Sequence, residues 1–165
     1  MPTLYEKNLK HTFDVGWEVE KYDEWVFYRK QFLSVPKTRG VDFLAIDPEE
    51  NTLWLIELKD YRIGAKYLKE TPLWDVVAFK VRDTLAEIMA ASHADAYASH
   101  AFAKKAVHAK KLRVVLHLEQ NVHRAFDRAD VQQKLKSRVK AIDAHPLVVE
   151  LDEPRTIRWI ISSNP

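Results

Sequence analysis

The chain has 165 residues, a formal net charge of +2 and no cysteine. This length predicts a single domain over residues 1–165, with a core large enough to fold without cross-links. The absence of cysteine excludes disulfides and thiolate metal sites. There is no N-terminal apolar run of signal-peptide length and no stretch of about 20 apolar residues that would span a membrane. We therefore expect a soluble, cytoplasmic protein that does not bind membranes.

The N-terminal part of the chain is predicted to contain one helix and two extended segments. Thr3 and Glu6 have the spacing of a capping box, which predicts a short helix over residues 4–11. Residues 17–22 alternate apolar and charged side chains, as a half-buried strand does. Residues 24–33 are rich in aromatic side chains, which favours an extended segment that continues the meander.

Two apolar strands joined by a turn form the clearest pattern in the sequence. Residues 41–46 and 53–59 are apolar, except for charged side chains near the ends that lie away from the connection. The connection, residues 47–52, is composed of typical turn residues. The pattern predicts an antiparallel hairpin.

The remainder of the chain alternates between helical and strand patterns. Apolar residues at steps of three and four predict a helix over residues 73–92. The later predicted elements are a helical stretch at 94–111, a buried strand at 112–118, a helix at 130–142, and strands at 147–151 and 156–161. This order predicts an α/β fold in which helices pack on a mixed sheet.

The hairpin register brings two acids together. With a six-residue turn, Ile46 lies opposite Leu53, and Asp42 then falls opposite Glu57 on the same face of the sheet. An odd slip of the register would separate the two carboxylates, whereas an even slip would leave them on one face.

Paired carboxylates at the ends of apolar strands repel each other, and the loss of solvent makes the repulsion worse. A hard divalent cation such as Mg²⁺ offsets this cost, because it prefers oxygen ligands. Lys59 lies two residues beyond Glu57 on the same face and can direct its ammonium to the same place. The backbone carbonyl of Leu58 would complete the metal's coordination.

These residues resemble the signature of a known superfamily. Gly40-Val41-Asp42, followed by Ile56-Glu57-Leu58-Lys59, is similar to the PD-(D/E)xK nuclease motif. That superfamily includes restriction endonucleases, Holliday-junction resolvases, and repair and defence nucleases. The resemblance implies a restriction-endonuclease-like αβββαβ core over about residues 3–118, with a C-terminal extension at 119–165 that adds a helix and strands.

The resemblance also implies an activity, namely metal-dependent hydrolysis of phosphodiester bonds, most plausibly in DNA. Asp42, Glu57 and the Leu58 carbonyl would hold Mg²⁺ or Mn²⁺, and Lys59 would assist the attacking water. Val41 replaces the usual proline of the motif. Members often supply a further acid from the first helix, but the only carboxylate there, Glu6, is better explained by the capping box. Three acids near the first strand remain as alternatives, with Asp23 slightly favoured as a metal ligand over Glu18 and Glu20.

Basic residues after the motif are candidates for phosphate contacts. The candidates are Arg62, Lys66 and Lys80, together with Tyr61 and Lys69. The alternatives are an ordinary polar loop for the first group and, for Lys80, an intrahelical pair with Asp83 or Glu87. The basic run at residues 104–111 is more typical of a solvated helix face than of a nucleic-acid surface.

Two other hypotheses compete with a nuclease. The near-neutral charge neither requires nor excludes a nucleic-acid partner. The second hypothesis is a catalytically inactive module of the same fold, which binds nucleic acid or assembles a complex. The third is an interaction subunit whose acids are structural, with Glu57 and Lys59 as an ion pair. If it is a nuclease, a homodimer or a partner protein would supply its specificity.

Overall fold

The computed structural model describes residues 1–62, 71–151 and 157–163. The strands are β1 (Thr3–Glu6), β2 (Leu9–Thr12), β3 (Glu18–Lys21), β4 (Phe43–Asp47), β5 (Thr52–Tyr61), β6 (Lys111–Gln120), β7 (Leu147–Val149) and β8 (Ile160–Ser163). The helices are α1 (Leu73–Ala91), α2 (His100–Val107) and α3 (Arg128–Val139), with a 3-10 turn η1 (Tyr22–Glu24) and a π-helical turn η2 (Tyr28–Phe32).

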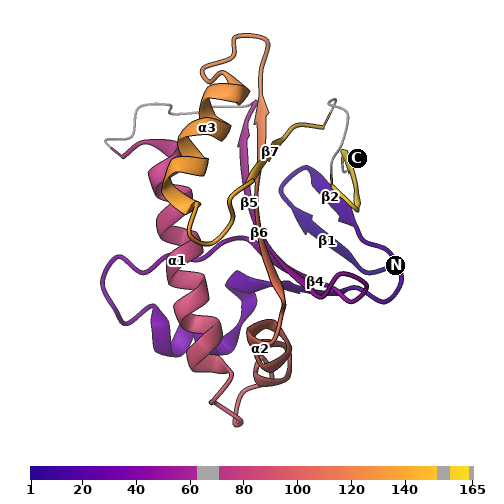
Figure 1. The fold of residues 1–165 in the computed structure, drawn as a ribbon, viewed down its shortest axis with the longest axis vertical. Helices are drawn as coiled ribbons and strands as arrows, with labels where there is room; N and C mark the ends of the chain where they lie inside the picture. Colours follow the sequence, from indigo (N-terminus) through magenta and orange to yellow (C-terminus); the bar gives the residue numbers. More distant parts are fainter. Residues whose placement is uncertain (63–70, 152–156, 164–165) are drawn as a thin grey trace.

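A five-stranded mixed sheet in the order β3-β4-β5-β6-β7 forms the centre of the molecule. Its first three strands are antiparallel, and β6 and β7 continue the sheet in parallel with β5. The three α-helices cover one face, and a smaller sheet in the order β1-β2-β8 lies on the other (Figure 1). The prediction of a mixed α/β fold with helices packed on the sheet is confirmed.

Alternation along the central strands explains this layering. In β5, Leu53 and Leu55 pack in the helix-covered core, whereas Trp54 and Ile56 pack against the small sheet. Because successive side chains point to opposite faces, a strand covered on both sides is apolar throughout. The predicted hairpin register is confirmed, since Ile46 pairs with Leu53.

The predicted N-terminal helix is wrong. Residues 3–12 form the antiparallel hairpin β1-β2, which turns at Lys7, a residue with a left-handed φ of 52°. Leu9 and His11 both point inward and are fully buried. This alternation with period two determines the structure, and the Thr3–Glu6 spacing that suggested a capping box is coincidental.

Two further expectations need correction. Residues 24–33 are not an extended strand, because the chain turns at η1 and coils through η2, with Trp25 and Phe27 buried between these two turns. The helical stretch expected at 94–111 is shorter, with α2 confined to His100–Val107. No helix in the three described ranges is long and apolar enough to cross a membrane.

Candidate active site

Asp42 and Glu57 lie opposite each other at one end of the central hairpin. The backbone N–H of Asp42 donates to the Ile56 carbonyl at 3.1 Å, which extends the β4-β5 pairing by one residue. The Asp42 carboxylate turns back over β5, and its Oδ2 accepts from the Leu58 N–H at 2.6 Å. This hydrogen bond fixes the first predicted acid beside the second.

Glu57 and Lys59 project toward the helix-covered face, as their period-two relation to Leu55 requires. The Glu57 side chain is fully buried, whereas those of Asp42 and Lys59 are about one-fifth exposed, at 22% and 21%. Lys59 Nζ forms a close ion pair with Glu57 Oε1 and lies 3.3 Å from the Leu58 carbonyl. The three predicted residues therefore converge at the rim of the core.

Lys80 of α1 completes this cluster from the other side. Its Nζ lies 2.7 Å and 2.8 Å from the two Glu57 oxygens and 3.7 Å from Asp42 Oδ1. The intrahelical alternatives for Lys80 are not formed, since Asp83 accepts hydrogen bonds from Arg82 and Glu87 accepts one from Tyr22. Lys80 was expected to contact phosphate; in the structure it pairs with both acids.

The cluster of Asp42, Glu57, Lys59 and Lys80 therefore contains two carboxylates and two ammonium groups. Burial and the neighbouring Asp42 charge raise the pKa of the Glu57 carboxyl, although both lysines oppose the shift. Burial alone would lower the pKa of Lys59, but the Glu57 carboxylate reverses this effect and raises it. The lysines offset the repulsion between the acids, so the charge balance does not by itself require a metal.

The oxygen donors nevertheless suit a hard divalent cation. Asp42 Oδ1, the Glu57 carboxylate and the Leu58 carbonyl all surround the region that the two ammonium groups approach. In the described part of the chain, no group of three or more acidic or histidine side chains is arranged to hold a metal. A third acid from Asp23, Glu18 or Glu20 thus does not join the pair.

The other predicted contacts lie elsewhere. Arg62 forms a two-pronged ion pair with Asp60, at 2.9 Å and 2.7 Å, on the face of β5 opposite to the cluster. Tyr61 packs against Phe126 at 5.9 Å between ring centroids. Lys66 and Lys69 are outside the described residues.

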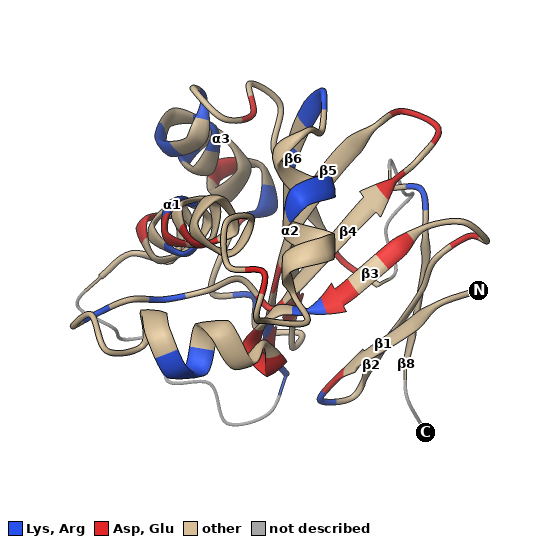
Figure 2. Cartoon of the chain, turned by 90° about the horizontal axis from the view of Figure 1, so that it is seen from below, with Lys and Arg blue, Asp and Glu red and all other residues tan. Residues whose placement is uncertain are grey.

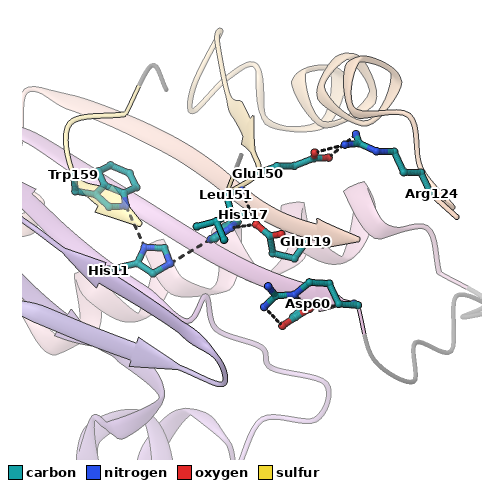
Figure 3. Close-up of polar contacts among 9 residues, drawn as sticks. His11, Asp60, His117, Glu119, Arg124, Glu150, Leu151 and Trp159 are labelled. Atoms are coloured by element: carbon teal, nitrogen blue, oxygen red, sulfur yellow. Dashed lines mark hydrogen bonds and ion pairs between the residues drawn. The ribbon is translucent and has the colours of Figure 1, made fainter. Parts of the chain in front are cut away.

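A buried polar chain links the two sheets, and sequence reasoning missed it (Figure 3). Trp159 Nε1 donates to His11 Nδ1 at 3.1 Å, and His11 Nε2 lies 3.3 Å from His117 Nδ1. His117 Nε2 is 2.6 Å from Glu119 Oε1. In neutral rings this order places both imidazole protons on Nε2, each directed toward the next acceptor. The only sequence signal was a histidine within the apolar strand β6.

Glu119 ends this chain as a carboxylate. Burial would raise its pKa, but hydrogen bonds from His117 and the Leu151 N–H lower the pKa below its usual value. Arg124 and Glu150 form an ion pair at the same edge (Figure 3). The polar chain lies between the sheets, while the Asp42–Glu57 cluster lies on the helix side, so the two polar groups are on opposite faces of the central sheet.

Comparison with known proteins gives one informative similarity. No protein-family model matches the chain, and no solved structure matches it. A cysteine--tRNA ligase from Neisseria meningitidis serogroup A is 32% identical over 72% of this chain and 21% of the ligase. The match thus spans about a fifth of the ligase's length.

Proposed function

We propose that this protein is a divalent-metal-dependent nuclease of the PD-(D/E)xK superfamily that hydrolyses phosphodiester bonds in DNA. The observation that supports this proposal most directly is the convergence of Asp42, Glu57 and Lys59 on one face of adjacent strands. The cluster places two acids side by side at a partly open rim, with the Lys59 and Lys80 ammonium groups beside them.

The order of the elements also supports a restriction-endonuclease-like fold. The antiparallel meander β3-β4-β5 is followed by α1 and then by β6, which pairs with β5 in parallel. These are five of the six elements of the αβββαβ core, in sequence. The hairpin β1-β2 stands where that core has its first helix.

In the proposed reaction, Asp42, Glu57 and the Leu58 carbonyl would hold Mg²⁺ or Mn²⁺, which would supply Lewis-acid activation of the phosphoryl group and of water. Lys59 donates a hydrogen bond from Nζ to the developing negative charge on the phosphate oxygens. Lys80 favours the ionised form of Glu57, against the effect of burial. With the Glu57 charge balanced by a bound cation, the Lys80 ammonium would be free to donate to a phosphate.

A catalytically inactive module of the same fold is the second candidate. The observation in its favour is that the two lysines already neutralise the two acids. Such a module would bind nucleic acid without cutting it. Because the ligase in the comparison bears the name of a tRNA-acting enzyme, RNA belongs among the substrates to be tested.

Cleavage of labelled single-stranded, duplex and branched DNA and of RNA, with Mg²⁺ or Mn²⁺, distinguishes these candidates. We expect Lys59→Ala to lower the cleavage rate by about 100-fold or more, because it removes a donor to the transition state. Lys104→Ala, an exposed lysine of α2, is the matched control and should cut like the wild type. Circular dichroism should show both variants folded.

Two results would redirect the interpretation. If the wild type binds these nucleic acids but cuts none of them, the inactive module is the better account. Cleavage that survives both Asp42→Ala and Lys59→Ala places the reaction elsewhere. As an independent readout, Mg²⁺ should raise the melting temperature of the wild type by mass action and should not raise that of Glu57→Gln.

A further inference from the structure

The connection between β3 and β4 has acids at its ends, at Asp23, Glu24 and Asp42, and a stretch between them that carries only positive charge. We define the basic coil as residues 26–39, which contain four cationic side chains and no acid. The four are Arg29, Lys30, Lys37 and Arg39. In Figure 2, blue residues mark the helical part of this coil, beyond the red residues of η1.

The inner side of the coil is anchored to the core. Phe27 is buried and packs against Phe32 and Tyr97, at 5.8 Å and 5.0 Å between ring centroids. Gln31 Nε2 donates to the Tyr97 hydroxyl at 2.7 Å. These contacts hold the backbone of the coil against the core, so the side chains on its solvent-facing side have defined positions.

Three aliphatic side chains on that outer side are exposed to solvent. Val26, Leu33 and Val35 are 53%, 49% and 57% exposed. They lie among the cationic residues of the same coil. A surface that alternates cations and exposed apolar groups is suited to a ligand with charged and apolar parts.

Within the described residues, the cations of the coil are not paired with acids. In the ranges that the structure describes, Lys30, Lys37 and Arg39 form no ion pair, and Arg29 Nε donates only to the Asp23 carbonyl. The basic run of α2 and early β6 differs, since three of its cations are paired. These pairs are Lys105–Glu18, Lys111–Glu50 and Arg113–Asp143.

The coil also lies at the end of the sheet where the Asp42–Glu57 cluster is found. It leaves β3 beyond Lys21, which pairs with Phe43, and it re-enters the sheet at Asp42. The Arg39 N–H donates to Asp83 Oδ2 at 3.2 Å, one turn of α1 beyond Lys80. A strand bound along the coil would therefore reach the cluster directly.

We propose that the basic coil binds a single-stranded segment of nucleic acid and leads it to the Asp42–Glu57 cluster. The cations contact phosphates, and the exposed aliphatic groups bury the apolar faces of unpaired bases, which a paired duplex would not offer. The binding stands on the coil alone, whereas delivery to a cleavage site rests on the function proposed above.

The test is binding of a fluorescent 20-nucleotide oligothymidylate in EDTA, over a range of salt concentrations. Lys30→Gln with Lys37→Gln should weaken binding about tenfold or more at 0.1 M salt and reduce the salt slope by about 1.4, since each single-strand phosphate contact contributes about 0.7. Leu33→Ser with Val35→Ser should weaken binding but leave the slope unchanged.

The matched control is Lys104→Gln with Lys110→Gln, two exposed lysines at the opposite end of the sheet, which should bind like the wild type. Equal losses in the control and coil variants would overturn the proposal. So would tighter binding of a duplex of equal length, or binding of the coil to vesicles of anionic phospholipid in place of the oligonucleotide. Binding through the coil without cleavage in Mg²⁺ would count against the nuclease alone.

Discussion

Lys80 is the residue on which the charge balance of the cluster depends. It contacts both oxygens of Glu57, which is fully buried, while Lys59 pairs with one of them. Without Lys80, only one ammonium group, that of Lys59, would remain to offset the repulsion between the Glu57 and Asp42 carboxylates. The removal of one partner from a buried pair is costly because the other charge stays desolvated.

We therefore expect Lys80→Met to lower the free energy of unfolding by about 2–4 kcal/mol, measured by urea denaturation at neutral pH. The double variant Lys80→Met with Glu57→Gln should recover most of the lost stability, because the buried charge is then removed. Arg82→Met, at an exposed position of the same helix, serves as the control. An equal, small loss of stability in Lys80→Met and in Arg82→Met would show that Lys80 does not stabilise Glu57.

Glu87 is a second buried acid on α1, and its pKa makes stability depend on pH. Burial raises the pKa of Glu87 to about 7, although a hydrogen bond from Tyr22 lowers it. A carboxyl whose pKa is higher in the folded state than in the unfolded state loses its proton at a lower pH in the unfolded chain. Its ionisation therefore favours the unfolded chain as pH rises.

From this shift we expect the stability contribution of Glu87 to be intact below its ordinary pKa of 4.5 and to be lost as pH rises to about 7. The loss between pH 5 and pH 8 is on the order of 3 kcal/mol. Glu87→Gln keeps an acceptor for Tyr22 and should remove this part of the pH dependence. Parallel wild-type and variant stability curves from pH 5 to pH 8 would contradict the prediction.

At the scale of elements, the hairpin was predictable and its surroundings were not. Two apolar runs on either side of a turn determine the register, and the register alone places Asp42 opposite Glu57. The structure shortens the predicted turn, because Asp47 and Thr52 pair as the last residues of the hairpin ladder. Lys80 could not be assigned in this way, because its position depends on how α1 crosses the sheet. The same holds for the His11–His117 contact, which joins strands more than one hundred residues apart in sequence.

Short local patterns gave wrong predictions for two segments in which the same residues are compatible with both a helix and a strand. Thr3 and Glu6 fit a helix cap, but the inward alternation of Leu9 and His11 is satisfied only by a hairpin. In residues 24–33, aromatic content favoured a strand. Residues 28–32 instead form η2, and Trp25 and Phe27 are buried in the segment between η1 and η2.

Gly40 is the point at which the basic coil enters β4, and its lack of a side chain is required there. A Cβ at Gly40 would lie 2.1 Å from Cε1 of Tyr22, a fully buried ring. Gly40→Ala should therefore lower the free energy of unfolding by about 2–3 kcal/mol, through displacement of Tyr22.

Thermal and urea unfolding would measure this loss. Tyr22→Leu, which removes most of the ring, is the test of the cause. The loss of stability in the double variant should be smaller than the sum of the losses in the two single variants, because the alanine side chain then has space. Strict additivity would mean that Gly40 acts through its backbone conformation and not through the contact with Tyr22.

At the scale of the whole molecule, the small sheet is held against the central one by a cluster of aromatic rings. Trp159 lies 5.3 Å from Phe13 and 5.2 Å from Trp54 between ring centroids, and its indole N–H begins the buried polar chain. Trp159 thus joins the last described strand to the central sheet, together with Ile157 and Ile161, which are buried in the same cluster.

Trp159→Ala should cost about 3–5 kcal/mol, the usual range for removal of a buried tryptophan. Hydrogen exchange should show that the amides of β2 and β8 open together and with a lower opening free energy than in the wild type. The amides of β5 and β6 should keep their wild-type protection. Trp159→Phe, which retains most of the ring contacts, is the milder control. Uniform acceleration of exchange in both sheets would indicate one cooperative unit instead of a separable layer.

The first and last strands of the described chain flank the same neighbour. Thr3 and Ile160 both pair with Thr12, one from each side, so β1 and β8 run about 10 Å apart. A short linker could join them, and new termini could then be opened in the exposed turn at residues 48–50. Such a circular permutant would retain every strand pairing while moving Asp42 and Glu57 to opposite ends of the polypeptide. The two acids would then be held together by the sheet alone, with no turn between them.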